Sequence, residues 1–376
     1  MNNTVTTGRA AHEAALAQVA EAATLAALGG GEKARARHVA RGKMLPRDRV
    51  AETLCAAGLW TAFRTRPYSQ VPLSGSRPDA LFVTAIDTQP LAADPAIVIA
   101  EHGQQFKNGL EVLRRLINGA VYLCTAPDWQ GEVPEGVHPV GFAGPHPAGL
   151  PGTHIHHLYP VSAGRTVWHV GYQDVIAIGY LFSAGHLWTE RVIALAGRGV
   201  NKPRLISTQL GAAIEDLVAN ELDSAQPTRI ISGSVLHGRE VTDVAGWLGR
   251  YHLQVTALPE RGRRKLFGWF RSGGYSFAGR LSSNTPTPGD HLITTGQYGR
   301  PTAMIPIDAF DKVMPLDMLA VPLLKALLIK DTDQAQRLGC LELDPEDLAL
   351  CSFVCPGKND YGAVLRENLI QIERDG

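Results

Sequence analysis

The stretch FKNGLEVLRRLINGAVYLCTA (106–126) decides the fold class. Its apolar side chains recur at spacings of 4, 3 and 4, on one helix face: Phe106, Leu110, Leu113 and Ile117. Asn118-Gly119 predicts the end of this helix, and AVYLCTA (120–126) has the short apolar run of a buried strand. An amphipathic helix followed directly by a buried strand indicates a parallel α/β domain.

The flanking sequence extends the α/β pattern. ALFVTAID (80–87) and AIVIAEH (96–102) are short apolar runs and predict two further buried strands. WHVGYQDVIAIGYLF (168–182) reads as a strand that leads into a helix. A ligand of such a sheet would sit at the carboxyl ends of the strands. No G-x-G-x-x-G and no P-loop lysine motif follows a strand, so the usual glycine cradle for a pyrophosphate is missing.

The rest of the chain has a different character. RVIALAG and RLISTQL (191–210) read as a hairpin, AAIEDLV as a short helix and RIISGSVL as a returning strand, which together suggest a small β-grasp module. Residues 271–300 are rich in Gly, Ser, Thr and Pro and predict a surface loop. The C-terminal segment has helical spacing, with Asp344 as an N-cap and Pro345 at the first helical position.

These patterns divide the chain into five segments. Residues 1–28 are alanine-rich and helical in composition, and 33–49 carry seven Lys or Arg, which we interpret as a solvated face or a contact with another protein of a complex. The expected division is a helical, basic extension (1–50), a Rossmann-like α/β domain (51–187), a β-grasp domain (188–270), a loop region (271–302) and a helical domain (303–376).

Composition excludes several classes of function. Lys+Arg and Asp+Glu are both 36, so the balanced charge draws the protein neither to nucleic acid nor to an anionic membrane. Five scattered cysteines and no signal peptide favour a reducing cytoplasm with free thiols. No run of about 18 apolar residues occurs, so we expect a protein that docks on a membrane complex without spanning the membrane.

LALCSFVCP (348–356) raises the question of an iron–sulfur cluster. A cubane cluster needs four thiolates, usually in a close C-x2-C-x2-C run with a distant fourth. Here only Cys340, Cys351 and Cys355 lie near one another in sequence, with ten and three residues between them. We interpret the segment as a decayed cluster domain whose cysteines are small buried side chains.

Several long stretches resemble a known family, the A subunit of the bacterial Na+-translocating NADH:quinone oxidoreductase. The resemblance covers about residues 50–376, and its most specific stretches are GLWTAFRTRPYS (58–69), FVTAIDTQPLAADP (82–95), GFAGPHPAGL (141–150), WHVGYQDVIAIGYLF (168–182) and LGCLELDPEDLALCSFVCPGKNDYGAVLRENL (338–369).

The resemblance implies a function. A member of that family is a peripheral subunit on the cytoplasmic face of the bacterial inner membrane. Its complex oxidises NADH, reduces ubiquinone and exports Na+. By resemblance, FMN, FAD, riboflavin and iron–sulfur centres belong to partner subunits, the large membrane-embedded B subunit is the chief partner, and this chain carries no redox centre of its own. The relatives share an α/β domain, a β-grasp (SLBB-like) domain and a C-terminal helical domain.

The N-terminal segment departs from the family pattern. Family members normally begin with a carrier-like β domain before the GLWTA segment, and that domain is missing here. Instead, LGGGEKARARHVARGKMLPRDRV (28–50) resembles the start of the β subunit of acyl-CoA carboxyltransferases, such as methylcrotonyl-CoA carboxylase. The carboxyltransferase core does not follow, so no acyl-CoA or biotin site is inferred.

A histidine-rich segment, GTHIHHLYP (152–160), has the residue type of a metal site. If it formed a strand, His154 and His156 would share one face as a chelating pair, with His146 and His169 as neighbours. No Cys, Asp or Glu lies between 146 and 169 to complete the ligand set. We favour a structural role for these histidines, and expect no metal site.

Quinone and nucleotide binding are the two candidate activities of the α/β domain. A quinone site needs an apolar slot and one or two donors to the carbonyl oxygens. Trp168, His169, Tyr172 and Gln173 could supply this site for ubiquinone, with His169 and Tyr172 as donors, although the same aromatic residues also suit a core. For NADH or FMN, HPAGLPG (146–152) is only a weak remnant of a cradle.

Three functional hypotheses follow. The first is an accessory or quinone-binding subunit of the Na+-translocating enzyme, with no catalysis by the isolated chain. The second is a stand-alone oxidoreductase that binds FMN or NADH in the α/β domain. The third is a fusion product that does not assemble.

Overall fold

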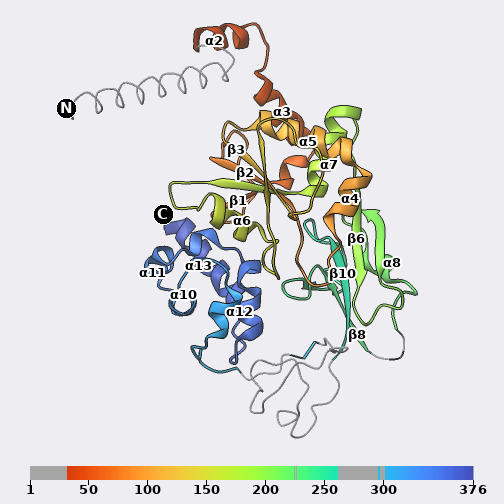
Figure 1. The fold of residues 1–376 in the computed structure, drawn as a ribbon, viewed down its shortest axis with the longest axis vertical. Helices are drawn as coiled ribbons and strands as arrows, with labels where there is room; N and C mark the ends of the chain where they lie inside the picture. The colour runs from red at the N-terminus through yellow and green to blue at the C-terminus, as the bar shows by residue number, and fades with distance from the viewer. Residues whose placement is uncertain (1–31, 224, 226, 261–294, 297–300, 376) are drawn as a thin grey trace, which may run out of the picture.

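The computed structural model describes residues 32–223, 225, 227–260, 295–296 and 301–375. The helix expected at 1–28 lies outside these residues, as does nearly all of the loop expected at 271–300. The described chain forms two five-stranded sheets and a group of C-terminal helices. Figure 1 shows the C-terminal helices below the first sheet and the second sheet beside them.

The first sheet is a largely parallel one with the strand order β1-β5-β2-β3-β4. Its strands are β1 (Arg64–Arg66), β2 (Ala80–Ala85), β3 (Ala120–Thr125), β4 (Val137–Gly141) and β5 (Val167–Gly171). β5, β2, β3 and β4 run parallel, whereas the short edge strand β1 pairs antiparallel with β5. The strands predicted at 80–87 and 120–126 are therefore confirmed, and so is the strand-to-helix order of residues 168–182.

Two helices cover one face of the first sheet: α5 (Gly103–Leu116) and α7 (Tyr172–Ala184). The predicted stripe is confirmed, because Phe106, Leu110 and Leu113 are buried in the core between α5 and the sheet. Glycines let the two helices touch backbone to backbone. A Cβ at Gly109 would lie 2.1 Å from Val175 O, and one at Gly179 would lie 1.8 Å from Gln105 O. The other face packs on α6 (Pro151–Leu158).

The strand predicted at 96–102 is wrong. These residues form α4 (Pro95–Glu101), whose first turn is capped by the carboxylate of Asp94, which accepts from Ala96 N at 2.9 Å. The β-branched run AIVIA suggested a strand, but Asp94 and Pro95 are standard helix-start residues and settled the conformation. Tertiary packing of Val98 and Ile99 into the core then holds the helix.

The second sheet has the order β7-β6-β10-β8-β9. Its strands are β6 (Glu190–Ala196), β7 (Arg204–Gln209), β8 (Thr228–Ser232), β9 (Arg239–Glu240) and β10 (Gln254–Pro259), and the short helix α8 (Ile214–Val218) packs on it. The predicted hairpin, short helix and returning strand are all confirmed as β6–β7, α8 and β8. β10 is the central strand, parallel to β6 and antiparallel to β8, and it joins the β6–β7 and β8–β9 pairs into one sheet.

The C-terminal residues are helical, as predicted. They form α9 (Ala309–Val313), α10 (Ala320–Leu328), α11 (Thr332–Arg337), α12 (Ala349–Val354) and α13 (Tyr361–Asp375), with 3-10 turns at Cys340–Glu342 and Pro345–Leu348. Asp344 caps the second turn in a reciprocal capping box with Asp347, which confirms the predicted cap. The helices enclose a core of their own that contains all three C-terminal cysteines.

The basic segment forms two helices ahead of the first sheet, α2 (Glu32–Ala40) and α3 (Pro46–Ala56), which lead into a 3-10 turn at Leu59–Ala62. Lys33, Arg37 and Arg41 are exposed, whereas Val50 and Leu54 of α3 are buried in the core of the first sheet. α3 therefore belongs to the packed fold, whereas Lys33 and Arg37 of α2 face solvent.

Candidate functional site

A cavity of about 210 Å³ lies at the carboxyl ends of β2 and β5, where the two sheets and the C-terminal helices meet. We call it the central cavity. Its walls come from segments far apart in sequence: Thr84 of β2 with Ile86, Asp87 and Gln89 after it, Gly149–Pro151 before α6, His169–Asp174 at the β5–α7 junction, Arg250, Tyr251 and Leu253 ahead of β10, and Asp344 with Glu346 of the C-terminal helices. The position agrees with the expectation that ligands of a parallel sheet bind at its carboxyl edge.

Three buried polar atoms on the cavity wall have no hydrogen-bond partner within the described chain. They are Thr84 Oγ1, Gln89 Oε1 and His169 Nε2. Leaving a buried donor or acceptor unpaired costs about 1–3 kcal/mol, and nearly all such groups in folded proteins are paired. Three such atoms on the wall of one cavity therefore need polar partners, which ordered water or a ligand with hydrogen-bonding groups would supply.

His169 is positioned by strand register. It pairs with Phe82 of β2 and with Arg64 of β1, so its side chain lies on the same face as theirs. Burial holds the pKa of His169 well below its usual value, and the nearby Arg66 and Arg64 lower this pKa further. The imidazole is therefore neutral, with one nitrogen as donor and the other as acceptor.

Tyr172 and Gln173 begin α7 at the opposite wall. Gln173 Nε2 donates to Tyr172 Oη at 3.1 Å and to Val192 O at 2.7 Å, while Gln173 Oε1 accepts from Val192 N at 3.0 Å. Burial raises the pKa of Tyr172 to about 12, so the phenol keeps its proton at neutral pH. Gln173 thus connects α7 to β6 of the second sheet. Because Tyr172 Oη accepts the hydrogen bond from Gln173, its own proton is available to donate to another group.

A second inter-sheet tie is an ion pair on the cavity wall. Asp174 Oδ1 lies 2.5 Å from Arg191 Nη2 and 3.0 Å from Arg250 Nη2, and Asp174 Oδ2 accepts from Arg250 Nη1 at 3.2 Å. Both arginines therefore meet a carboxylate of the first sheet. Asp87, also on the wall, accepts from Gln89 N at 2.8 Å, and burial raises its pKa to about 6.

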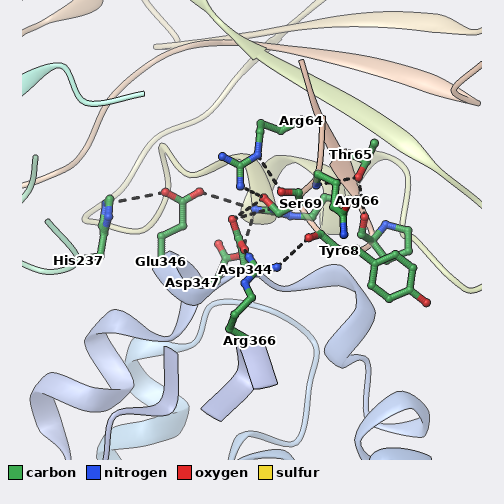
Figure 2. Close-up of polar contacts among 12 residues, drawn as sticks. Arg64, Thr65, Arg66, Tyr68, Ser69, His237, Asp344, Glu346, Asp347 and Arg366 are labelled. Carbon is green, nitrogen blue, oxygen red and sulfur yellow. Dashed lines mark hydrogen bonds and ion pairs between the residues drawn. The ribbon is translucent and has the colours of Figure 1, made fainter. Parts of the chain in front are cut away.

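Behind the cavity, Arg66 of β1 lies fully buried against three carboxylates of one 3-10 turn (Figure 2). Its guanidinium nitrogens lie 3.1 Å from Asp344, 3.7 Å from Glu346 and 3.6 Å from Asp347. We call these four residues the arginine–carboxylate cluster. They join the first sheet to the C-terminal helices.

The cluster is extended by neighbouring polar groups (Figure 2). Ser69 Oγ donates a hydrogen bond to Asp344 at 2.8 Å and accepts one from Arg64 Nη2 at 2.6 Å. Arg366 of α13 pairs with Asp344 and donates to Tyr68 O at 2.8 Å. His237 of the second sheet lies 3.8 Å from Glu346. All three parts of the fold therefore contribute to one buried charge network.

The carboxylates of the cluster have opposite pKa shifts. Burial raises the pKa of Glu346 to about 7, aided by the charge of Asp344, and burial together with Glu346 raises the pKa of Asp347 to about 7. Burial also acts on Asp344, but Arg66 and Arg366 outweigh it and hold the pKa of Asp344 below its usual value. One carboxylate thus stays charged, while two take up protons near neutral pH.

This arrangement predicts a pH-dependent difference between the wild type and Glu346→Gln. The folded-state pKa of Glu346 lies above the unfolded value of about 4.3. The folded state therefore binds more protons between about pH 4.3 and 7, and the contribution of Glu346 to stability falls as pH rises through that window. As pH rises through this window, we expect the free energy of unfolding of the variant to increase relative to that of the wild type, by at most about 1.4 kcal/mol per pH unit.

Urea unfolding at pH 5, 6, 7 and 8 measures this difference. Comparing the two proteins at each pH cancels the titration of buried histidines such as His154 and His252, whose depressed pKa values of about 4 act in the opposite direction. Glu367→Gln, on the exposed surface beside Lys330, is the control and should follow the wild type. A difference that stays constant with pH would contradict the expectation.

The chelating pair that a strand at residues 152–160 would create does not form, because Pro151–Leu158 is the helix α6. His154 is buried and contacts Ala148 O at 3.0 Å through Nε2. His156 Nε2 accepts from Asp317 N at 2.9 Å, so its Nδ1 carries the proton and donates to Glu342 at 2.9 Å. Both histidines have structural contacts. Within the described residues, no three His, Cys, Asp or Glu side chains gather as a metal-binding group.

The C-terminal cysteines are packing residues in the described structure. Cys340, Cys351 and Cys355 are buried in the core of the C-terminal helices. Burial raises the pKa of Cys340 and of Cys351 to about 12, so both remain thiols. Cys355 Sγ lies 3.5 Å from Tyr361 Oη and from Asn359 Nδ2.

The structure brings together three of the four candidate quinone residues. His169, Tyr172 and Gln173 line the central cavity. Trp168 points to the opposite face of β5, where its ring lies 5.4 Å from Trp60 and 5.6 Å from Phe63 in the core under α7. The HPAGLPG segment contributes Gly149–Pro151 to the cavity and then starts α6.

Sequence reasoning missed Thr84, Arg64 and the whole arginine–carboxylate cluster. Two arginines at alternate positions of FRTRP were a signal, since neighbours two apart on a strand share a face. The acidic partners of Arg66 lie more than 270 residues away in sequence, and only the tertiary fold reveals that pairing.

The fold and cavity define a multidomain α/β protein with a small polar site at the edge of a parallel sheet. The family model described as the second alpha/beta domain of NqrA matches residues 45–187, and the NQRA C-terminal domain model matches residues 192–243. No helix in the described residues has the length and apolar character needed to cross a membrane.

Curated relatives agree with the two family models. The A subunit of the Na(+)-translocating NADH-quinone reductase from Rhodopirellula baltica is 52% identical over 88% of this chain and 74% of its own length. Its namesake from Pseudomonas aeruginosa is also 52% identical, over 88% and 75%, and that from Tolumonas auensis is 50% identical, over 88% and 75%. The chain therefore belongs to the NqrA family, the A subunits of the Na+-translocating NADH-quinone reductases, as its sequence motifs predicted.

Proposed function

We propose that this chain works as a peripheral subunit of a Na+-translocating NADH-quinone reductase at the cytoplasmic face of the bacterial inner membrane. Family membership at about half identity supports this proposal. The membrane subunits would be its partners, chiefly the large B subunit, and the flavins (FMN, FAD and riboflavin) and iron–sulfur centres would belong to those partners. The isolated chain would not catalyse the reaction.

The finer architecture is also part of the proposal. The parallel sheet with α5, α6 and α7 would be a Rossmann-like domain (51–187), and the second sheet with α8 a β-grasp, SLBB-like domain (188–270). A helical domain (303–376) would follow the region 271–302. Residues 1–50 would be a helical, basic N-terminal extension, and the resemblance of residues 28–50 to carboxyltransferase β subunits stays a prediction.

Within this chain, the central cavity would bind the quinone ring. The observation that carries the proposal is the set of unpaired polar atoms beside two neutral donors, His169 and Tyr172. A quinone offers two carbonyl acceptors and no charge, which suits a neutral imidazole and a protonated phenol. Gln173 would hold Tyr172 in place without touching the ring, and Trp168 would act only through the core.

The cavity's size and charges favour a single ring over a flavin or dinucleotide. Its 210 Å³ falls below the roughly 300–1,000 Å³ of sites for larger ligands. Its arginines are also committed, since Arg191 and Arg250 bind Asp174 and Arg64 binds Ser69. A visible spectrum of the purified chain tests this point, because a stand-alone flavoprotein would absorb near about 450 nm.

The double variant His169→Ala/Tyr172→Phe is expected to weaken quinone binding by about fivefold or more. Each lost hydrogen bond contributes about 0.5–1.5 kcal/mol, so two correspond to roughly 5- to 150-fold in Kd. Titration of the full chain with a soluble ubiquinone analogue measures the effect. Tyr180→Phe is the matched control, because it removes a hydroxyl from the same helix outside the cavity. Unchanged affinity in the double variant would remove the proposal.

A further inference from the structure

A second hollow, with a volume of about 720 Å³, opens at the carboxyl ends of β2 and β3. We call it the alanine groove. It lies between α4, the start of α5 and the segment 126–132 that follows β3. Neither the family models nor the relatives' names assign a role to it.

The groove has an apolar interior. Ala96 and Ala100 are one turn apart on α4, exposed, and line one wall. Buried Ile99 and Phe106 also line it, and the ring of Trp129 lies 6.4 Å from that of Phe106. Small side chains on one wall and aromatic rings on the other leave a slot shaped for a narrow hydrocarbon.

The charges of the groove exclude anionic ligands. Of the described residues that line it, none is Lys or Arg, whereas Asp87, Asp94, Asp128 and Glu132 are acidic. Asp94 is used as the cap of α4, and Glu132 pairs with Lys107. A phosphate or carboxylate would meet only like charge here, so the groove suits an uncharged chain.

The groove is adjacent to the central cavity. Ile86 and Asp87 line both, since they stand at the carboxyl end of β2 between the two hollows. The two hollows therefore share one boundary, and a substituent on a ring beside His169 and Tyr172 would reach α4 by crossing it at Ile86. The polar hollow and the apolar hollow together match a molecule with a polar head and a hydrocarbon tail.

We propose that the alanine groove binds the hydrocarbon tail of the quinone whose ring occupies the central cavity. This inference rests on the proposed function and specifies its ligand as a long-chain quinone. Each methylene buried in the groove would tighten binding by up to about fourfold. The wild-type chain should therefore prefer a tailed quinone over the bare ring by tenfold or more.

The test uses two probes: 2,3-dimethoxy-5-methyl-1,4-benzoquinone, and the same ring with a decyl chain. Ala96→Trp and Ala100→Trp fill the groove, and we expect each to abolish most of the preference for the decyl probe while changing the Kd of the bare ring by less than twofold. Ile97→Trp is the matched control, since Ile97 is exposed on the same helix outside the groove. It should keep the full preference.

Each outcome decides between the two proposals. Equal affinity of the wild type for both probes, or an undiminished preference in both filled variants, would overturn the tail site. Failure of the quinone proposal gives a different result, because the Kd of the bare ring would then be the same for the wild type and for His169→Ala/Tyr172→Phe. If circular dichroism shows that either tryptophan variant does not fold, Ala100→Leu replaces it, because leucine narrows the groove less than tryptophan. A partial loss of the preference for the decyl probe is then expected.

Discussion

Replacing Arg66 by methionine is expected to lower the free energy of unfolding by about 3–5 kcal/mol. Arg66 has no exposed surface, and its guanidinium lies between the carboxylates of Asp344, Glu346 and Asp347. Methionine has a similar shape but no charge. It would leave Asp344 and its two neighbours buried without their central cation, which is the costly way to break a buried ion pair.

The measurement is urea unfolding of the full chain at pH 7, followed by far-ultraviolet circular dichroism. Arg366→Met is the matched control, because Arg366 contacts the same Asp344 but is 32% exposed and can be replaced by solvent. Its loss should be clearly smaller. A second comparison separates charge from packing: Glu346→Gln and Asp347→Asn, added to Arg66→Met, should recover part of the lost stability. A loss below about 1 kcal/mol for Arg66→Met would show that the cluster does not hold the parts together.

The cluster also explains why the cavity depends on the C-terminal helices. Asp344 and Glu346 line the cavity, and Arg66 fixes both from the first sheet. Gly152 of α6 is packed so tightly against the same turn that a Cβ there would lie 2.3 Å from Asp347 Oδ1. The helices that retain three buried cysteines thus form one wall of the proposed ligand site, so their packing has a direct consequence for binding.

Local patterns were sufficient for most elements of the fold. The stripe of α5, the apolar run of β3 and the β6–β7 hairpin each depend on neighbours within about ten residues, and such signals are present in the sequence itself. Residues 94–102 carry two conflicting local signals. The β-branched composition favours a strand, whereas Asp94-Pro95 favours a helix start, and the segment is α4.

The site was less accessible to sequence reasoning, for two physical reasons. Its charged network pairs Arg66 with residues of the Asp344 turn, and no periodicity connects positions so distant. In addition, the aromatic composition of WHVGYQDVIAIGYLF does not separate Trp168 from His169, although adjacent strand residues point to opposite faces. The side chains of Tyr172 and Gln173 both reach the cavity, because the chain turns from β5 into α7 at Gly171.

Substitutions of Trp168 are expected to change stability strongly and quinone affinity little, because this side chain packs in the core and does not line the cavity. Its side chain is 1% exposed and packs edge-on against Trp60. Trp168→Ala is expected to cost about 3–5 kcal/mol of unfolding free energy, because a large buried ring is replaced by a cavity. Trp168→Phe keeps most of that packing and should cost less, with quinone affinity within twofold of the wild type. Urea unfolding and quinone titration of the same preparations measure both quantities. If Trp168→Phe instead weakened binding tenfold at unchanged stability, Trp168 would have to contact the ligand.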